Sequence, residues 1–117
     1  MLDQEGCVFR PHVVPLMVGQ QLLVKNSDPL LHNVRANGVI NQGFNKSTPL
    51  EGVSFTQTFA TREIMVPFKC DVHAWMNARV HVVPHPFFYV SDVEGRYEIV
   101  GLPPGKYTLE VIHELPT

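Results

Sequence analysis

Residues 69–76 of the chain read Lys69-Cys70-Asp71-Val72-His73-Ala74-Trp75-Met76. A thiol, an imidazole and a thioether follow one another in this segment at intervals of three residues. The residues before it, from position 63, alternate like a β-strand, and the alternation places on one face Ile64, Val66, Phe68 and Cys70. We therefore expect the Cys70 sulfur to lie at the core end of a strand, with His73 and Met76 on the loop that follows.

Short alternating runs and turn residues continue through the whole chain. Ten prolines and eight glycines occur, and no segment keeps the 3.6-residue apolar period of a helix. The runs predict strands at residues 7–11, 13–18, 21–25, 33–36, 53–60, 63–70, 78–83, 96–100 and 106–113. Roughly eight or nine short strands at this spacing are typical of a β-sandwich. The predicted fold is all-β, a Greek-key sandwich.

Composition limits the classes of function. A chain of 117 residues with 44% hydrophobic and 17% charged residues is expected to fold as one domain over residues 1–117. The formal net charge of -2 offers no basic surface for nucleic acid. No apolar run approaches the roughly 18 residues of a membrane span, and no signal peptide is visible. The sequence also shows no glycine-rich phosphate loop, nucleophile elbow or spaced carboxylate pair, so we expect no enzyme.

A second imidazole completes a set of metal ligands. His32 lies 38 residues before Cys70, at a predicted boundary between a turn and a strand. One thiolate, two imidazoles and one thioether form the ligand set that holds redox-active copper in electron-transfer sites. Each residue taken singly is more often structural: a buried thiol, a hydrogen-bonded imidazole or a packed apolar side chain. Taken together they predict one copper ion, bound by His32, Cys70, His73 and Met76.

Several segments match the pattern of a known family. They are Val8-Phe9-Arg10-Pro11, Val18-Gly19-Gln20, Val24-Lys25-Asn26 leading to His32-Asn33-Val34, and the short ligand loop at 68–76. With them, residues 7–83 resemble the cupredoxins of the plastocyanin and amicyanin type. The resemblance implies a type 1 blue copper centre that carries single electrons, with His73 as the partly exposed ligand where redox partner proteins dock. It also implies that Asn33 holds the ligand loop, and that the protein is periplasmic or otherwise extracytoplasmic.

The remaining residues, 84–117, resemble something different. The segments Val90-Ser91-Asp92-Val93-Glu94-Gly95-Arg96-Tyr97-Glu98-Ile99 and Gly101-Leu102-Pro103-Pro104-Gly105-Lys106-Tyr107 are similar to the hairpin of carboxypeptidase regulatory-like domains. The combination resembles bacterial cupredoxin-like proteins, some of them labelled as methylamine-utilisation proteins. Because 34 residues after Val83 are too few for a second domain, we expect a β extension packed on the same sandwich.

Cys7 departs from the cupredoxin pattern, since it falls where plastocyanins carry an apolar residue beside the copper site. Three interpretations stay open. Cys7 is a buried thiol without a role, or it forms a disulfide with Cys70 that removes the thiolate. Alternatively it joins the metal chemistry, as an extra copper ligand or in a Cys₂His₂ zinc set with Cys70, His32 and His73. We favour copper over zinc, because zinc leaves Met76 unexplained.

The other histidines and the function leave further alternatives. A second metal site built from His12, His85 and His113 is the less favoured interpretation, and structural histidines that donate or accept hydrogen bonds are the simpler one. The favoured function is one-electron transfer by copper. The alternatives are a copper carrier or storage module, and a non-redox structural or interaction sandwich with a Cys7–Cys70 disulfide.

Overall fold

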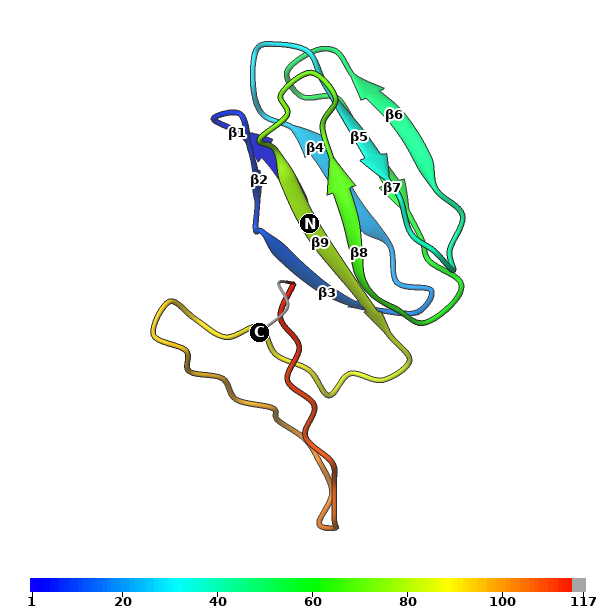
Figure 1. Cartoon of the computed structure of the whole chain (residues 1–117), viewed down its shortest axis with the longest axis vertical. Helices are drawn as coiled ribbons and strands as arrows, with labels where there is room; N and C mark the ends of the chain where they lie inside the picture. Colours follow the sequence, from blue (N-terminus) through cyan, green and yellow to red (C-terminus); the bar gives the residue numbers. More distant parts are fainter. Residues whose placement is uncertain (115–117) are drawn as a thin grey trace.

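A computed structural model describes residues 1–114, which form two packed β-sheets (Figure 1). One sheet has the strand order β2-β1-β4-β7 and contains β1 (Leu2–Glu5), β2 (Val8–Arg10), β4 (Leu22–Asn26) and β7 (Ser54–Gln57). The other has the order β3-β9-β8-β5-β6 and contains β3 (Val13–Met17), β5 (His32–Ala36), β6 (Phe44–Thr48), β8 (Glu63–Lys69) and β9 (Asn77–Val83). The prediction of an all-β sandwich is confirmed.

The sandwich encloses a core that follows from the alternation of the strands. On β4, Leu22 and Val24 are buried while Leu23 between them is exposed. Phe68 of β8 is fully buried, and its ring meets the edges or faces of Phe44 and Phe59 at centroid distances of 5.7 and 6.2 Å. The apolar faces of the two sheets therefore close on each other, and they support the strand ends from which the candidate site is built.

A β-bulge changes the predicted face of one residue in β8. The pairing of β8 with β9 shifts register between Glu63 and Val66, and Met65 has a left-handed φ of 54°. Ile64 is consequently 42% exposed and Glu63 only 7% exposed, so the inward position predicted for Ile64 is wrong. Val66, Phe68 and Cys70, which follow the bulge, are buried as predicted. The bulge thus resets the alternation, and Cys70 still lies at the core end of the strand.

The buried carboxylate of Glu63 accepts hydrogen bonds from the loop between β5 and β6. It accepts N–H groups of Val39, Ile40 and Asn41 at 2.5, 3.2 and 2.8 Å. A Cβ at Gly38 would lie 2.7 Å from Oε1 of Glu63, so a side chain at this position would displace the carboxylate. Burial alone would raise the pKa of Glu63, but the hydrogen bonds from the 39–41 segment outweigh it and lower the pKa.

The lowered pKa of Glu63 predicts a pH-dependent contribution to stability. A depressed folded-state pKa stabilises the protein above the ordinary value of 4.5, and this contribution disappears as the pH falls toward the folded-state pKa. We expect Glu63→Gln to lower the free energy of unfolding at pH 7 by about 1–3 kcal/mol. The loss should shrink at acidic pH, as measured by urea unfolding between neutral and acidic pH. Exposed Glu51 offers a control as Glu51→Gln; a variant of Glu63 that matches it at every pH would contradict the expectation.

The segment after β9 differs from its prediction. The structure assigns no strand to residues 84–114, so the strands predicted at residues 96–100 and 106–113 are corrected. Figure 1 shows this segment, yellow to red, leaving the end of β9 and folding back beside β3. Most of its side chains are exposed, among them Tyr89, Tyr97 and Tyr107. A two-stranded ribbon that buries little apolar surface is only marginally stable. This is the physical reason that residues 84–114 form no ladder of paired strands.

Ion pairs attach the same segment to the sandwich. Glu114 lies 3.2 Å from Arg79 of β9 and 2.5 Å from His12, and Glu110 lies 3.9 Å from Arg62. The exposed pair of Arg62 and Glu110 stabilises this contact only weakly, whereas the pair of Arg79 and Glu114 is partly buried. The assignment of one domain, with residues 7–83 as its core and residues 84–117 as an extension packed on the same sandwich, remains our proposal.

No helix in the part of the chain that the structure describes is long and apolar enough to cross a membrane.

Candidate metal centre

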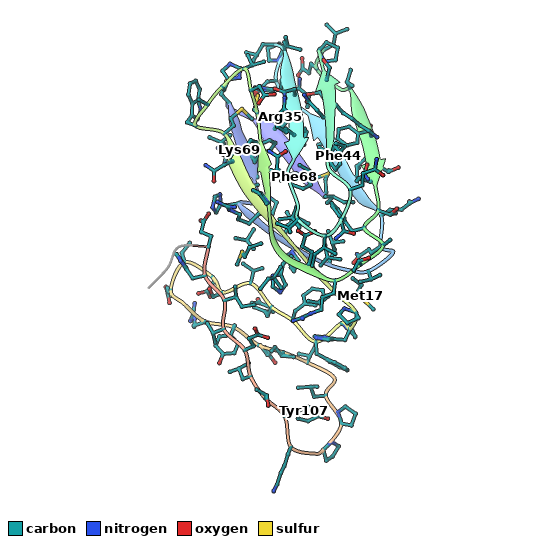
Figure 2. The ribbon with its side chains drawn as sticks, turned by 45° about the vertical axis from the view of Figure 1, so that its right-hand side comes forward. Met17, Arg35, Phe44, Phe68, Lys69 and Tyr107 are labelled. Atoms are coloured by element: carbon teal, nitrogen blue, oxygen red, sulfur yellow. The ribbon has the colours of Figure 1, made fainter. Side chains whose placement is uncertain are left out.

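Three of the predicted ligands converge at one end of the sandwich. Nδ1 of His32 and Nδ1 of His73 lie 3.1 Å apart, and Sγ of Cys70 lies 4.0 Å from each of them. Donor atoms that share one ion at metal–ligand distances of about 2.0–2.3 Å lie roughly 3–4 Å from one another. His32 begins β5, while Cys70 follows β8 and His73 belongs to the next loop. Figure 2 marks this end of the molecule with Lys69 and Arg35, far from Tyr107 of the C-terminal segment.

The burial of the three donors differs. His32 is fully buried and Cys70 is 3% exposed, whereas His73 is half-buried. The His73 ring contacts the rings of His32 and Trp75, with centroid distances of 4.9 and 5.2 Å. One imidazole of the cluster therefore lies between the buried thiol and the surface.

Asp28 orients the buried histidine. Its Oδ2 lies 2.7 Å from Nε2 of His32, so Nε2 donates its proton to the carboxylate and Nδ1 presents a lone pair to the cluster. Burial would raise the pKa of Asp28, but hydrogen bonds from the amides of Cys7 and Gly6 and from His32 outweigh this effect and lower the pKa. Asp28 thus remains a carboxylate, and it fixes the tautomer in which Nδ1 of His32 has a lone pair available to a metal ion.

Asn33 connects β5 to the ligand loop. Its Oδ1 accepts the backbone N–H of Asp71 at 2.7 Å and lies 3.4 Å from the Cys70 thiol. Its Nδ2 donates to Asp71 and to Asn45, both at 3.0 Å. The role expected for Asn33, holding the ligand loop, agrees with these contacts.

Two backbone hydrogen bonds of Met76 close the loop of residues 70–76, here called the ligand loop. The Met76 N–H donates to the carbonyl of His73 at 3.0 Å, and the Cys70 N–H donates to the carbonyl of Met76 at 3.3 Å. The Met76 side chain is buried. The loop is therefore a compact turn whose ends are fixed at Cys70 and Met76.

Cys7 lies beside the same cluster. Its Sγ and one ring nitrogen each of His32 and His73 all lie within 4.8 Å of one another. Cys7 and the two histidines are thus a second set of three donor atoms at this place, beside the set of Cys70, His32 and His73. Both cysteines are free thiols, so the structure does not contain the Cys7–Cys70 disulfide that the sequence left open.

The three histidines of the less favoured second site lie elsewhere. His12, His85 and His113 line a cavity of about 740 Å³ between the β3–β9 face and the C-terminal segment. His12 contacts the carbonyl of Asn77 and the carboxylate of Glu114, and Nδ1 of His85 accepts the N–H of Phe87. The lining of this cavity does not include the cluster of Cys7, His32, Cys70 and His73.

Sequence reasoning missed two residues of the site. The sequence pattern assigns Asp28 no role in the site, although an acid four residues before a candidate ligand histidine is a usable signal. The sequence pattern likewise assigns no role to Trp75, yet its indole N–H donates to the carbonyl of Cys7 at 2.7 Å. No pattern in the sequence indicates that second contact, because 68 residues separate the two partners.

Comparisons with known proteins agree on the architecture. No protein-family model matches the sequence, and no curated protein matches it either. Among solved structures, an oxidised variant of amicyanin matches with a TM-score of 0.61 at 18% identity, over 69% of this chain and 78% of that one. The copper-containing nitrite reductase of Thermus scotoductus matches with a TM-score of 0.63 at 20% identity, over 69% of this chain and 21% of that one. A purple protein of the same fold from Nitrosopumilus maritimus matches with a TM-score of 0.56 at 22% identity, over 66% of this chain and 83% of that one.

Proposed function

We propose that this chain, whose fold is that of the cupredoxins, binds one copper ion and carries single electrons. His32, Cys70 and His73 are the proposed strong ligands, and Met76 is the proposed weak one. The observation that carries the proposal is the convergence of two imidazole nitrogens 3.1 Å apart with a thiol 4.0 Å from each. This donor set fits copper, because a thiolate suits Cu(I) and imidazoles suit both oxidation states.

The surrounding residues support electron transfer in three ways. Asp28 and Asn33 fix the ring of His32 and the ligand loop, so little movement of the ligands is needed when one electron arrives or leaves. A bound copper ion would supply the one-electron Cu(I)/Cu(II) couple. The burial of His32 and Cys70 excludes water from the donors. These features favour an electron carrier over a catalyst, since two of the three strong donors are closed to a substrate.

The surface around His73 supports a role in contacting redox partner proteins. Val72 and Trp75 of the ligand loop are exposed, at 49% and 62%, and so is the neighbouring Leu31 at 46%. An apolar surface of this kind suits brief contacts with another protein. We propose that electrons enter and leave through the half-buried His73 at this surface, and that the protein works outside the cytoplasm, as its resemblance to cupredoxins implies.

Voltammetry tests the proposed electron transfer. The copper-loaded protein is expected to give a reversible wave of one electron per bound copper. Protein loaded with zinc, which has no accessible redox couple, serves as the control and should give no wave. Stoichiometric copper without a reversible wave would contradict electron transfer and favour a copper carrier or storage module.

A further inference from the structure

We infer, on the basis of the proposed copper site, that Cys7 supplies a second thiolate to the same ion. The ion would then be held by two cysteines and two histidines, with Met76 at most a weak additional contact. Cys7 is brought to the cluster by the turn between β1 and β2, so this ligand comes from the opposite sheet to His32 and Cys70.

Geometry is the first support for this inference. The Cys7 sulfur and one ring nitrogen each of His32 and His73 all lie within 4.8 Å of one another, a range that includes the roughly 3–4 Å between atoms that share one ion. The Cys70 sulfur lies 4.0 Å from Nδ1 of both histidines. Each thiol is therefore near both imidazoles, and a single ion between the imidazoles is within reach of two sulfurs.

The backbone around Cys7 is fixed from both sides. Asp28, which orients His32, also accepts the N–H groups of Gly6 and Cys7 at 2.8 and 2.9 Å. The carbonyl of Cys7 accepts the indole N–H of Trp75, two residues beyond His73. One acid thus positions His32 and Cys7 together, and the ligand loop itself is bonded to the turn that carries Cys7.

The conformation of Cys7 agrees with a positioned residue. Gly6 and Cys7 have φ values of 66° and 56°, both in the left-handed region. Glycine or asparagine is favoured at such turn positions, whereas a cysteine there is strained. A cysteine with no role at the second position would be an unfavourable choice, and a cysteine that binds the metal explains it.

A second thiolate has a defined electronic consequence. It adds negative charge beside the ion, and negative charge stabilises Cu(II) relative to Cu(I). Cys7 should therefore lower the reduction potential of the site, and Cys7→Ala should raise it.

X-ray absorption at the copper edge tests the inference by counting short copper–sulfur bonds. The wild type is expected to show two, and Cys7→Ala one, with the intense visible absorption of a copper–thiolate bond retained in both. Alkylation of the wild-type thiols provides a second measurement that needs no variant. Copper should protect both Cys7 and Cys70, while Cys7, which is half-buried, should react in metal-free protein.

The outcomes separate this inference from the proposed function. The role of Cys7 would be overturned if both proteins had one short copper–sulfur bond and an intact copper–thiolate absorption, and if Cys7 were still alkylated in the copper-loaded wild type. The proposed copper site would then still stand. Copper bound without any short sulfur in the wild type would overturn both. If Cys7→Ala does not fold, the sulfur count and the alkylation of the wild type decide alone.

Discussion

In a Cys7→Ala background, the replacement Cys70→Ser is expected to abolish the intense visible absorption of the copper-loaded protein. That absorption arises from charge transfer between a thiolate and copper, and the double variant has no thiolate left. A serine oxygen is also a harder ligand than sulfur and suits Cu(I) poorly. Copper affinity should fall by more than about 100-fold, since even residues that only orient a ligand contribute about 10–100-fold.

The matched control is the single variant Cys7→Ala, which keeps Cys70 and should keep the absorption. Competition with a copper chelator measures the affinity of both proteins, and circular dichroism shows whether both retain the β-sandwich. Cys70 is part of the buried core, so this check of folding is needed. A folded double variant that keeps the intense absorption would rule out Cys70 as the thiolate ligand.

The replacement Asp28→Asn is expected to weaken copper binding by about 10–100-fold and to destabilise the metal-free protein by about 1–3 kcal/mol. Oδ2 of Asp28 accepts both the His32 ring and the Cys7 amide, while Oδ1 accepts the Gly6 amide. An asparagine amide nitrogen cannot accept a hydrogen bond, so one side of this arrangement loses its acceptor. The expected result is a less well fixed tautomer of His32 and a looser turn at Cys7.

Asp3→Asn provides the control for this prediction. Asp3 is a second buried aspartate, which accepts the Ser27 hydroxyl and lies 3.9 Å from Lys25 without touching His32. The Asp3→Asn variant should lower the free energy of unfolding, measured by urea denaturation, but leave the copper affinity unchanged. Equal losses of copper affinity in the two variants would contradict a specific role for Asp28.

The ligand loop was predictable because its information is local. Cys70 and His73 are three residues apart, and the alternation of β8 beyond the bulge is enough to direct the thiol to the core. His32 was found because the turn before it and the strand after it both have clear signals in the sequence. The structure brings these three donors together, and the two-sheet fold was predicted for the same reason, from turns and alternation.

What the sequence did not predict depends on contacts between distant residues. The bulge at Met65 has no local signal, so Ile64 was assigned to the wrong face. The contact of Asp28 with His32 depends on the side-chain direction at a turn, and the bond from Trp75 to Cys7 joins segments 68 residues apart. Residues 96–113 have the alternation of strands, but alternation predicts a strand only where a sheet covers one face. The resemblance of residues 90–107 to a regulatory-like hairpin stays a prediction.

The absorption and electron paramagnetic resonance spectra of the wild type, recorded after one equivalent of Cu(II), test the central claim most directly. We expect an intense visible band and a narrow copper hyperfine splitting, because the thiolate of Cys70 shares the unpaired electron with the ion. A one-electron reductant should bleach the band and an oxidant should restore it. A weak visible band with the wide hyperfine splitting of copper bound by nitrogen and oxygen alone would contradict the account.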